Sequence, residues 1–409
     1  MKRWIGFAAA LIAAAGSPVA QGQTVSILRS FTEVGGDGFG AYGGLTLGGS
    51  TLYGTTRGGG IGNNGIVYKM NLDGSGFRVL HSFTGGGGDG SNPYCDLMLS
   101  GSTLYGTTAF GGSSNRGTIF KINIDGSGFN LLHSFSGGSS DGQYPNSARL
   151  VLSGSTLYGT TPGGGSNACG TVYKIGSDGS GFGILHSFNG SGDGKAPYGG
   201  LTLNGSTLYG TTHDGGPSNG GTIFKMNTSG GSFSVLRSFT WGDGGSPANG
   251  LILDGSTLYG TTCFGGGGSD CGTVFKIGTD GTGFSQLHSF AGGDGKRPYC
   301  ALALGDSVLY GTTLLGGSSS LGTLFKVGAD GSDFTVLHSF AGGGSDGDTP
   351  YSTPLLVGST LYGTTYFGGG SDSGVVFSVT VPEPATFVLL GIGSTSLWAF
   401  AWRRRNRTA

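Results

Sequence analysis

The chain has 409 residues, of which 93 are Gly, and only 11% of its residues are charged. Sixteen Tyr and 25 Phe accompany the Gly, so the chain can bury an apolar core, and the lack of a Gly-X-Y period excludes collagen. The formal net charge is −1, and Lys and Arg cluster only at the extreme C-terminus. This balance argues against binding to nucleic acid or non-specific adhesion to an anionic membrane surface.

The first 20 residues have the three parts of a signal peptide. Lys2 and Arg3 supply positive charge, residues 5–15 form an apolar stretch too short to span a bilayer comfortably, and residues 18–20 offer small side chains near a cleavage point. An ordinary N-terminal helix is the alternative, although Gly16 and Ser17 would interrupt it. We therefore expect export and removal of residues 1–20 by signal peptidase.

The middle of the chain is an internal repeat. The string Leu-Tyr-Gly-Thr-Thr occurs seven times, at intervals of 50 to 53 residues. Its tyrosines are Tyr53, Tyr105, Tyr158, Tyr209, Tyr259, Tyr310 and Tyr362. This period is typical of β-propeller blades and lies close to the length of a kelch repeat.

Each repeat contains four short segments rich in β-branched and aromatic residues, which predict four strands. In the fourth repeat they are residues 201–203, 206–212, 221–225 and 233–239. Tight Gly-Ser and Asp-Gly-Ser-Gly turns alternate with longer Gly-rich loops. Since alternate connections of an up-and-down sheet lie on one face, we expect both long loops of every repeat on the same face of the molecule.

The two ends of the repeat array indicate a closed ring. Residues 25–31 match the fourth segment of a repeat, whereas residues 374–379 match the third. A leading strand that completes the last sheet explains this arrangement. We therefore predict that residues 25–380 form an all-β, seven-bladed β-propeller of four-stranded blades, in which the N-terminal strand completes the C-terminal blade. A β-solenoid or a stacked array of hairpins is the alternative.

Two cationic positions recur in the repeats. The fourth segment carries His or Arg, at Arg29, His81, His133, His186, Arg237, His288 and His338. Because Arg does not replace imidazole as a metal ligand, we interpret this position as a solvated outer strand. The third segment ends in Lys, at Lys69, Lys121, Lys174, Lys225, Lys276 and Lys326, with Ser378 in the seventh copy. We interpret these lysines as edge positions that discourage aggregation.

An aspartate precedes Gly in every loop between repeats. These residues are Asp37, Asp89, Asp141, Asp193, Asp243, Asp294 and Asp346. The favoured interpretation is a turn aspartate that accepts hydrogen bonds from local backbone N–H groups. A ring of carboxylates that binds Ca²⁺ or polyols is the alternative. Sevenfold recurrence favours the turn, and we expect no cofactor and no other metal.

The sequence shows no catalytic constellation. Glutamate occurs only at Glu33 and Glu383, and nucleophile-elbow, P-loop, zinc-protease and dinucleotide fingerprints are absent. A propeller-type enzyme acting on glycans or phosphoesters remains the alternative. Its weak candidates are the departures from the repeat at His213 and Asp214, Lys296 and Arg297, and Asp346 and Asp348.

Five cysteines, an odd number, lie in long-loop regions: Cys95, Cys169, Cys263, Cys271 and Cys300. Cys263 and Cys271 bracket one loop of a single repeat, and export permits disulfides. We therefore expect a bridge between these two.

The C-terminal residues 381–409 have the pattern of a sorting signal. Pro382, Glu383 and Pro384 precede an uncharged, mostly apolar stretch at 385–402, long enough for a transmembrane helix, and Arg403, Arg404 and Arg405 follow it. A plain membrane anchor is the alternative. The pattern closely resembles the PEP-CTERM sorting signal of Gram-negative bacteria. That resemblance implies recognition by an exosortase, cleavage near Pro-Glu-Pro, and delivery to the surface or matrix of biofilm-forming, exopolysaccharide-producing cells.

The repeats resemble the GloVer family of choice-of-anchor tandem repeat proteins through their Leu-Tyr-Gly-Thr-Thr and Gly-Thr-Val-Phe-Lys strings. This resemblance implies architecture and location but no chemistry. We expect a non-enzymatic surface or matrix protein whose long-loop face contacts polysaccharide or another surface protein.

Overall fold

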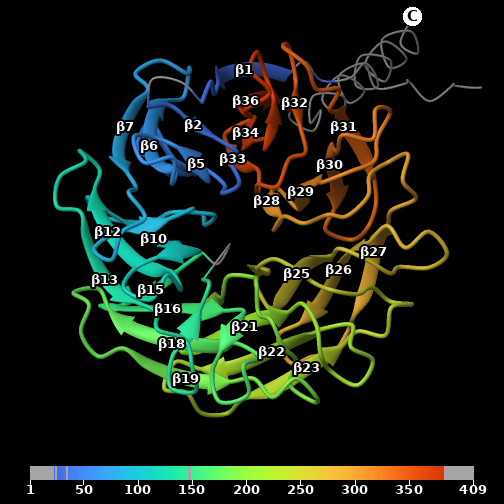
Figure 1. Ribbon diagram of the computed structural model, residues 1–409. Helices are drawn as coiled ribbons and strands as arrows, with labels where there is room; N and C mark the ends of the chain where they lie inside the picture. Colours follow the sequence, from blue (N-terminus) through green and yellow to red (C-terminus); the bar gives the residue numbers. More distant parts are fainter. Residues whose placement is uncertain (1–22, 24, 34–35, 146–148, 382–409) are drawn as a thin grey trace, which may run out of the picture.

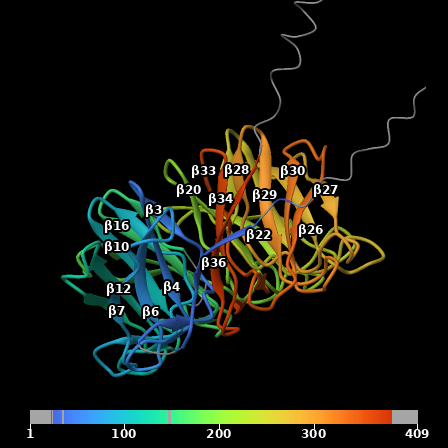
Figure 2. The ribbon, with the colours of Figure 1, turned by 90° about the horizontal axis from the view of Figure 1, so that it is seen from above.

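The computed structural model describes residues 23, 25–33, 36–145 and 149–381. These residues form seven four-stranded antiparallel sheets arranged as blades around a central axis (Figure 1). Turned by 90°, the ring is seen from its edge, and the strands run between its two faces (Figure 2). The predicted seven-bladed β-propeller is therefore confirmed.

The strands of blades 1 to 4 follow one another from the axis outward. They are β3 (Thr46–Gly48), β4 (Thr51–Thr56), β6 (Ile66–Asn71) and β7 (Arg78–Ser82) in blade 1; β9 (Met98–Ser100), β10 (Thr103–Thr108), β12 (Thr118–Asn123) and β13 (Asn130–Ser134) in blade 2; β15 (Val151–Ser153), β16 (Thr156–Thr161), β18 (Thr171–Gly176) and β19 (Gly183–Ser187) in blade 3; and β20 (Thr202–Asn204), β21 (Thr207–Thr212), β22 (Thr222–Asn227) and β23 (Ser234–Ser238) in blade 4.

Blades 5 and 6 repeat this order, and blade 7 takes its outermost strand from the start of the chain. The strands are β24 (Ile252–Asp254), β25 (Thr257–Thr262), β26 (Thr273–Gly278) and β27 (Ser285–Ser289) in blade 5; β28 (Ala303–Gly305), β29 (Val308–Thr313), β30 (Thr323–Gly328) and β31 (Thr335–Ser339) in blade 6; and β33 (Leu355–Val357), β34 (Thr360–Thr364), β36 (Val375–Thr380) and β1 (Val25–Ser30) in blade 7.

Ring closure is visible where β1 lies beside β36 (Figure 1). The two strands are antiparallel, with Val25 opposite Val379 and Ile27 opposite Phe377. A second contact closes the ring near the axis, because the Thr364 hydroxyl of blade 7 donates to the Gly43 carbonyl at the entrance to blade 1, at 3.1 Å.

Aromatic side chains fill the spaces between blades. At the boundary of blades 1 and 2, the fully buried Phe83 meets Phe120 edge-on, with ring centroids 5.3 Å apart. The tip of Phe120 crosses the neighbouring strand at Gly106, where an added Cβ would lie 2.6 Å from the ring. The Gly of the recurrent Leu-Tyr-Gly-Thr-Thr string therefore leaves room for the aromatic ring of the third strand, since any larger residue would overlap with it.

The long loops are joined to one another by small sheets on a single face, as predicted. The loop that enters a blade pairs with the loop between that blade's second and third strands. These pairs are β2 (Gly38–Phe39) with β5 (Gly58–Gly59), β8 (Gly90–Ser91) with β11 (Phe110–Gly111), β14 (Gly142–Gln143) with β17 (Gly163–Gly164), and β32 (Gly347–Asp348) with β35 (Phe367–Gly368). We call this side of the ring the long-loop face and the opposite side the tight-turn face.

Candidate functional site

The recurrent cation of the fourth segment pairs with the recurrent loop aspartate. His133 lies 3.2 Å from Asp141, His288 lies 2.9 Å from Asp294, and Arg29 lies 2.8 Å from Asp37. The same contact joins His81 to Asp89, His186 to Asp193, Arg237 to Asp243 and His338 to Asp346. The prediction of an outer strand is confirmed, but the prediction that this position is solvated was wrong, because the histidine side chains are only 18–20% exposed.

The same cation also stacks on an aromatic ring of the next blade. The His133 ring lies parallel to Phe182 at 3.7 Å, and the Arg29 guanidinium lies 3.6 Å from the ring centre of Phe77. Each cation thus contacts the loop that leads into the next blade, and six of the seven also stack on an aromatic ring of that blade. The exception is His338, because Val25 occupies the position of the ring in blade 7. We call the cation, its aspartate and the ring a blade clamp.

The clamp aspartates act as the predicted turn caps. Asp141 accepts hydrogen bonds from the backbone N–H groups of Ser136 at 2.8 Å and Gly142 at 2.7 Å. Burial alone would raise the pKa of Asp141, but hydrogen bonds from His133 and Ser136 outweigh it and lower that pKa. Because the carboxylate oxygens already hold these donors, the clamp is structural in character. Within the described residues, no three His, Cys, Asp or Glu side chains gather into a group able to hold a metal ion.

The disulfide predicted between Cys263 and Cys271 is not formed, and both are free and buried. The Cys263 thiol lies near the Pro298 carbonyl and the tyrosines of the axis, whereas Cys271 packs with Phe290 in the core between blades 5 and 6. The two thiols therefore belong to different layers, although their residues bracket one loop. Cys95 and Cys300 occupy equivalent positions, and each exchanges hydrogen bonds with the backbone of a threonine, as the Ser352 hydroxyl does in blade 7.

The recurrent lysines tie neighbouring blades together rather than standing free. Lys69 of blade 1 donates to the Ile124 carbonyl of blade 2 at 3.2 Å, and Lys225 of blade 4 donates to the Thr279 carbonyl of blade 5 at 3.4 Å. These contacts lie at the tight turns between third and fourth strands. The lysines therefore contribute to the assembly of the ring.

The long-loop face carries an aromatic groove across blades 2 to 4, with a volume of about 560 Å³. Phe110 is 39% exposed there and meets Tyr144 edge-on at 5.5 Å. Its lining also includes Tyr94, Tyr198 and Gln143. Burial raises the pKa of Tyr94 and of Tyr198, so both phenols are neutral over the physiological range.

Two arginines flank this groove without an acidic partner. Arg116 donates to Gln143 and, at 3.0 Å, to the Tyr144 hydroxyl, and Arg57 donates to the Tyr366 hydroxyl and lies 5.9 Å from the ring centre of Tyr94. Among the described residues, neither guanidinium forms an ion pair with a carboxylate. The groove therefore combines exposed rings with positive charge that the protein does not neutralise.

Tyrosines gather around the axis near the same face. Tyr42 of blade 1 stacks on Tyr351 of blade 7 at 4.3 Å and meets Tyr94 of blade 2 edge-on at 5.0 Å. Burial, and then the nearby phenols of Tyr299 and Tyr351, raise the pKa of Tyr42 well above its ordinary value. These rings separate the long-loop face from a cavity farther along the axis.

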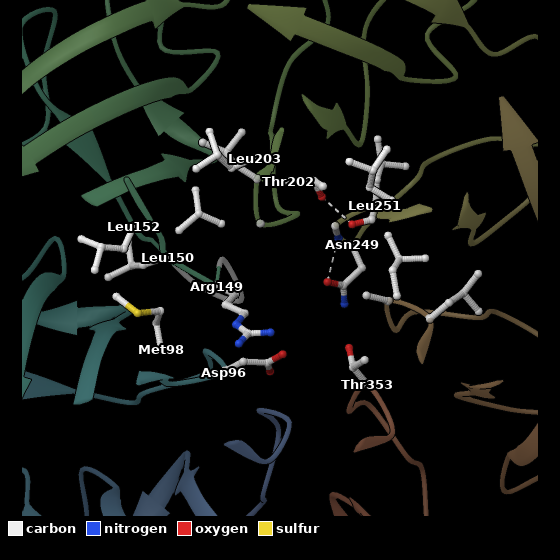
Figure 3. A pocket seen from close by; sticks show the side chains of 18 of the residues that line it. Asp96, Met98, Arg149, Leu150, Leu152, Thr202, Leu203, Asn249, Leu251 and Thr353 are labelled. Atoms are coloured by element: carbon white, nitrogen blue, oxygen red, sulfur yellow. Dashed lines mark hydrogen bonds between the residues drawn. The ribbon is translucent and has the colours of Figure 1, made fainter. Parts of the chain in front are cut away.

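That axial cavity is lined by the innermost strands and has a volume of about 660 Å³. Figure 3 shows Asp96 and Arg149 near one another on one side of it, with Asn249 and Thr353 on another. The sequence did not single out these four residues. A comparison of the seven repeats position by position would have found Asp96 and Arg149, because uncharged, mostly small residues occupy the same position in the other five blades.

The weak enzymatic candidates do not form one site. His213 pairs with its neighbour Asp214 at 2.8 Å in blade 4, and Arg297 lies over Phe264 at the entrance to blade 6. Asp346 belongs to the clamp of His338 near blade 7. These residues are thus distributed over three separate parts of the ring.

The predicted signal peptide at 1–20, the sorting residues Pro382, Glu383, Pro384, Arg403, Arg404 and Arg405, and the expected transmembrane helix at 385–402 lie outside the described residues. Within the part that is described, no helix is long and apolar enough to cross a membrane.

The fold and its clamps define a seven-bladed β-propeller built from tandem repeats. The model of the Gloeobacter/Verrucomicrobia repeat matches residues 18–145, 87–271 and 254–396, and the chain belongs to this family. The predicted resemblance to the GloVer family is thus confirmed. No curated protein matches the chain.

Several solved structures share the fold at low identity. An oligogalacturonate lyase in complex with manganese is 13% identical, with a TM-score of 0.58, over 89% of this chain and 95% of that one. The oligogalacturonate lyase of Vibrio parahaemolyticus is 14% identical, with a TM-score of 0.57, over 88% and 94%. The extracellular domain of a putative one-component system from B. thetaiotaomicron is 12% identical, with a TM-score of 0.56, over 87% and 40%. At these identities the likeness shows the fold alone.

Proposed function

We propose that this protein is exported, sorted by an exosortase to the cell surface or the extracellular matrix, and binds acidic polysaccharide there through its long-loop face without catalysing a reaction. The signal peptide, the Pro-Glu-Pro signal and the repeat family support the location. The aromatic groove flanked by Arg57 and Arg116 is the observation that carries the binding function.

The groove suits sugars because it joins flat apolar surfaces to polar groups. The exposed ring of Phe110 and the phenol of Tyr144 offer surfaces for the C–H face of a pyranose, and Gln143 offers an amide for hydroxyl groups. Phe110 and Gln143 lie in the small sheets that join the long loops, which lowers the entropy loss of ordering these loops on binding.

The two arginines select for acidic sugars. A guanidinium recognises a carboxylate with two parallel hydrogen bonds, and Arg116 forms no ion pair with a carboxylate in the described part of the chain. A uronate in the chain of a polysaccharide would supply that carboxylate. Binding should therefore weaken with salt, because the interaction is partly between exposed charges.

Surface plasmon resonance on immobilised polygalacturonate, with dextran as the neutral comparison, tests this proposal. We expect binding to polygalacturonate and a loss of affinity of about ten-fold or more in Phe110→Ala and in Arg116→Gln. Ile61→Ala and Arg78→Gln are matched controls, since both residues are exposed and lie outside the groove. Equal binding to dextran, or unchanged affinity in both groove variants, would contradict the proposal.

A further inference from the structure

The axial cavity is a separate feature from the aromatic groove. Its walls follow the innermost strands toward the tight-turn face, for example from Asp96, just before β9, to Ser100 and from Arg149, just before β15, to Leu152. A volume of about 660 Å³ lies within the range of small-molecule sites. The cavity is therefore large enough for a ligand with room for ordered water.

The charged residues of this cavity break the symmetry of the repeats. The position of Asp96 in blade 2 and Arg149 in blade 3 is occupied in the other five blades by Gly44, Gly200, Gly250, Ala301 and Thr353. The clamps recur in every blade and hold the ring, but this register needs no charge for packing in five of the seven blades. Two opposite charges in neighbouring blades, both facing the axis, thus point to a ligand.

Neither charge forms an ion pair with the other or with another described side chain. Asp96 and Arg149 form no ion pair within 4.0 Å, and the one hydrogen bond of the Asp96 side chain comes from the Gly44 N–H at 2.5 Å. Arg149 has no hydrogen-bond or ion-pair partner among the described residues. Both ends remain available to groups of opposite charge that enter between them (Figure 3).

The rest of the wall is mostly apolar. Met98, Leu152, Leu203 and Leu251 line the cavity with the charged pair (Figure 3). On the other side, the Asn249 side chain donates a hydrogen bond to the Tyr299 carbonyl at 2.9 Å and accepts one from the Gly250 N–H at 2.9 Å, and these two bonds fix its orientation. A ligand that satisfies this cavity needs a cationic group, an anionic group close to it, and an apolar body.

We propose that the axial cavity binds a small zwitterion with an apolar body, of the class of aliphatic α-amino acids. Asp96 receives the ammonium group, Arg149 receives the carboxylate, and the leucines contact the aliphatic side chain. Burial raises the pKa of Asp96 against the opposing effects of Gly44 and Arg149, so an incoming ammonium group is a favourable partner for this carboxylate.

Isothermal titration calorimetry with L-leucine tests the proposal. We expect L-leucine to bind, whereas leucinamide lacks the carboxylate, N-acetyl-L-leucine lacks the ammonium group, and glycine lacks the apolar body. Each omission should weaken binding by about ten-fold or more, since charged hydrogen bonds and apolar burial are each lost.

Asp96→Asn and Arg149→Gln should each weaken L-leucine binding by about ten- to a hundred-fold. Asp96→Asn keeps an oxygen for the Gly44 N–H, and Arg149 is exposed, so both variants should fold with an unchanged melting temperature. Asp254→Asn and Arg78→Gln are controls outside the cavity and should leave binding unchanged. Absence of heat with millimolar L-leucine, or equal affinity in both cavity variants, would overturn the proposal.

Polygalacturonate binding, measured on the same variants, separates the two sites. Asp96→Asn and Arg149→Gln should leave it unchanged, because the axial tyrosines lie between the cavity and the groove. If the unsubstituted protein binds L-leucine but not polygalacturonate, only the proposed function is contradicted.

Discussion

The clamp aspartates should be the polar residues on which the ring most depends, and Asp141→Ala tests this directly. Asp141 is 7% exposed and accepts hydrogen bonds from two backbone N–H groups, from the Ser136 hydroxyl at 2.8 Å and from His133 at 3.2 Å. Removing it leaves the buried Gly142 N–H unpaired, at about 1–3 kcal/mol, and also removes the part-buried hydrogen bonds from Ser136 and His133. We therefore expect a loss of about 3 kcal/mol in the free energy of unfolding.

Equilibrium unfolding in guanidinium chloride, followed by circular dichroism, measures this loss. Asp178→Ala is the matched control in the same blade, because Asp178 is also a turn aspartate and accepts the Ser180 N–H at 2.9 Å, but on the exposed surface. It should change the unfolding midpoint little. Asp141→Asn should fall between the two, because its amide has one oxygen for two backbone donors. Equal midpoints for Asp141→Ala and Asp178→Ala would refute the reasoning.

Three further predictions concern the clamps and the blades. Stability should fall below about pH 4, because a carboxyl with a lowered folded-state pKa stabilises the fold above its unfolded-state pKa and loses that effect as it is protonated. Melting temperatures across this acidic range check the expectation, and a flat profile there would contradict it. Val25→Phe should raise the free energy of unfolding by about 1 kcal/mol, because Val25 occupies the position next to His338 where the other blades have the stacking Phe. An unchanged or lower unfolding midpoint would count against the clamp. Gly210→Ala should lower the free energy of unfolding by about 1–3 kcal/mol, because the added Cβ would lie 2.5 Å from the Phe224 ring. Gly183→Ala is the control, since an added Cβ there meets no atom within 4 Å. Equal unfolding midpoints for the two variants would contradict the expectation that Gly210 is needed for packing.

The strands, the blade number and the closure could be predicted because the signals are local and repeated seven times. Each Leu-Tyr-Gly-Thr-Thr string is a strand, and the mismatch between the two ends of the array fixes the closing strand β1. The face of the long loops followed from alternation alone. These features depend on the order of residues along the chain and not on how side chains meet in space.

The clamp could not be predicted because its three side chains meet only in the folded structure. His133 and Asp141 were each noted as recurrent, but their contact depends on how the chain turns between them, and the stacked Phe182 comes from the next blade. A signal was nevertheless present, because every repeat that has the cation also has the aspartate six to eight residues later. The disulfide failed for the related reason that a short loop does not fix which way Cys263 and Cys271 face.

Symmetry separates the residues that build this ring from those that can give it a ligand. A residue present in all seven blades, such as the clamp aspartate, contributes to every boundary, so its recurrence is explained by stability. A charge found in one blade, such as Asp96 or Arg149, is not explained by the packing that all blades share, because uncharged residues pack well at the same position in the other blades. Asp96 is partly buried and its carboxylate receives a single hydrogen bond, from the Gly44 N–H, so holding its charge there costs free energy. A bound group of opposite charge would offset that cost, which makes the departures from the repeat the positions where ligand binding should be sought first.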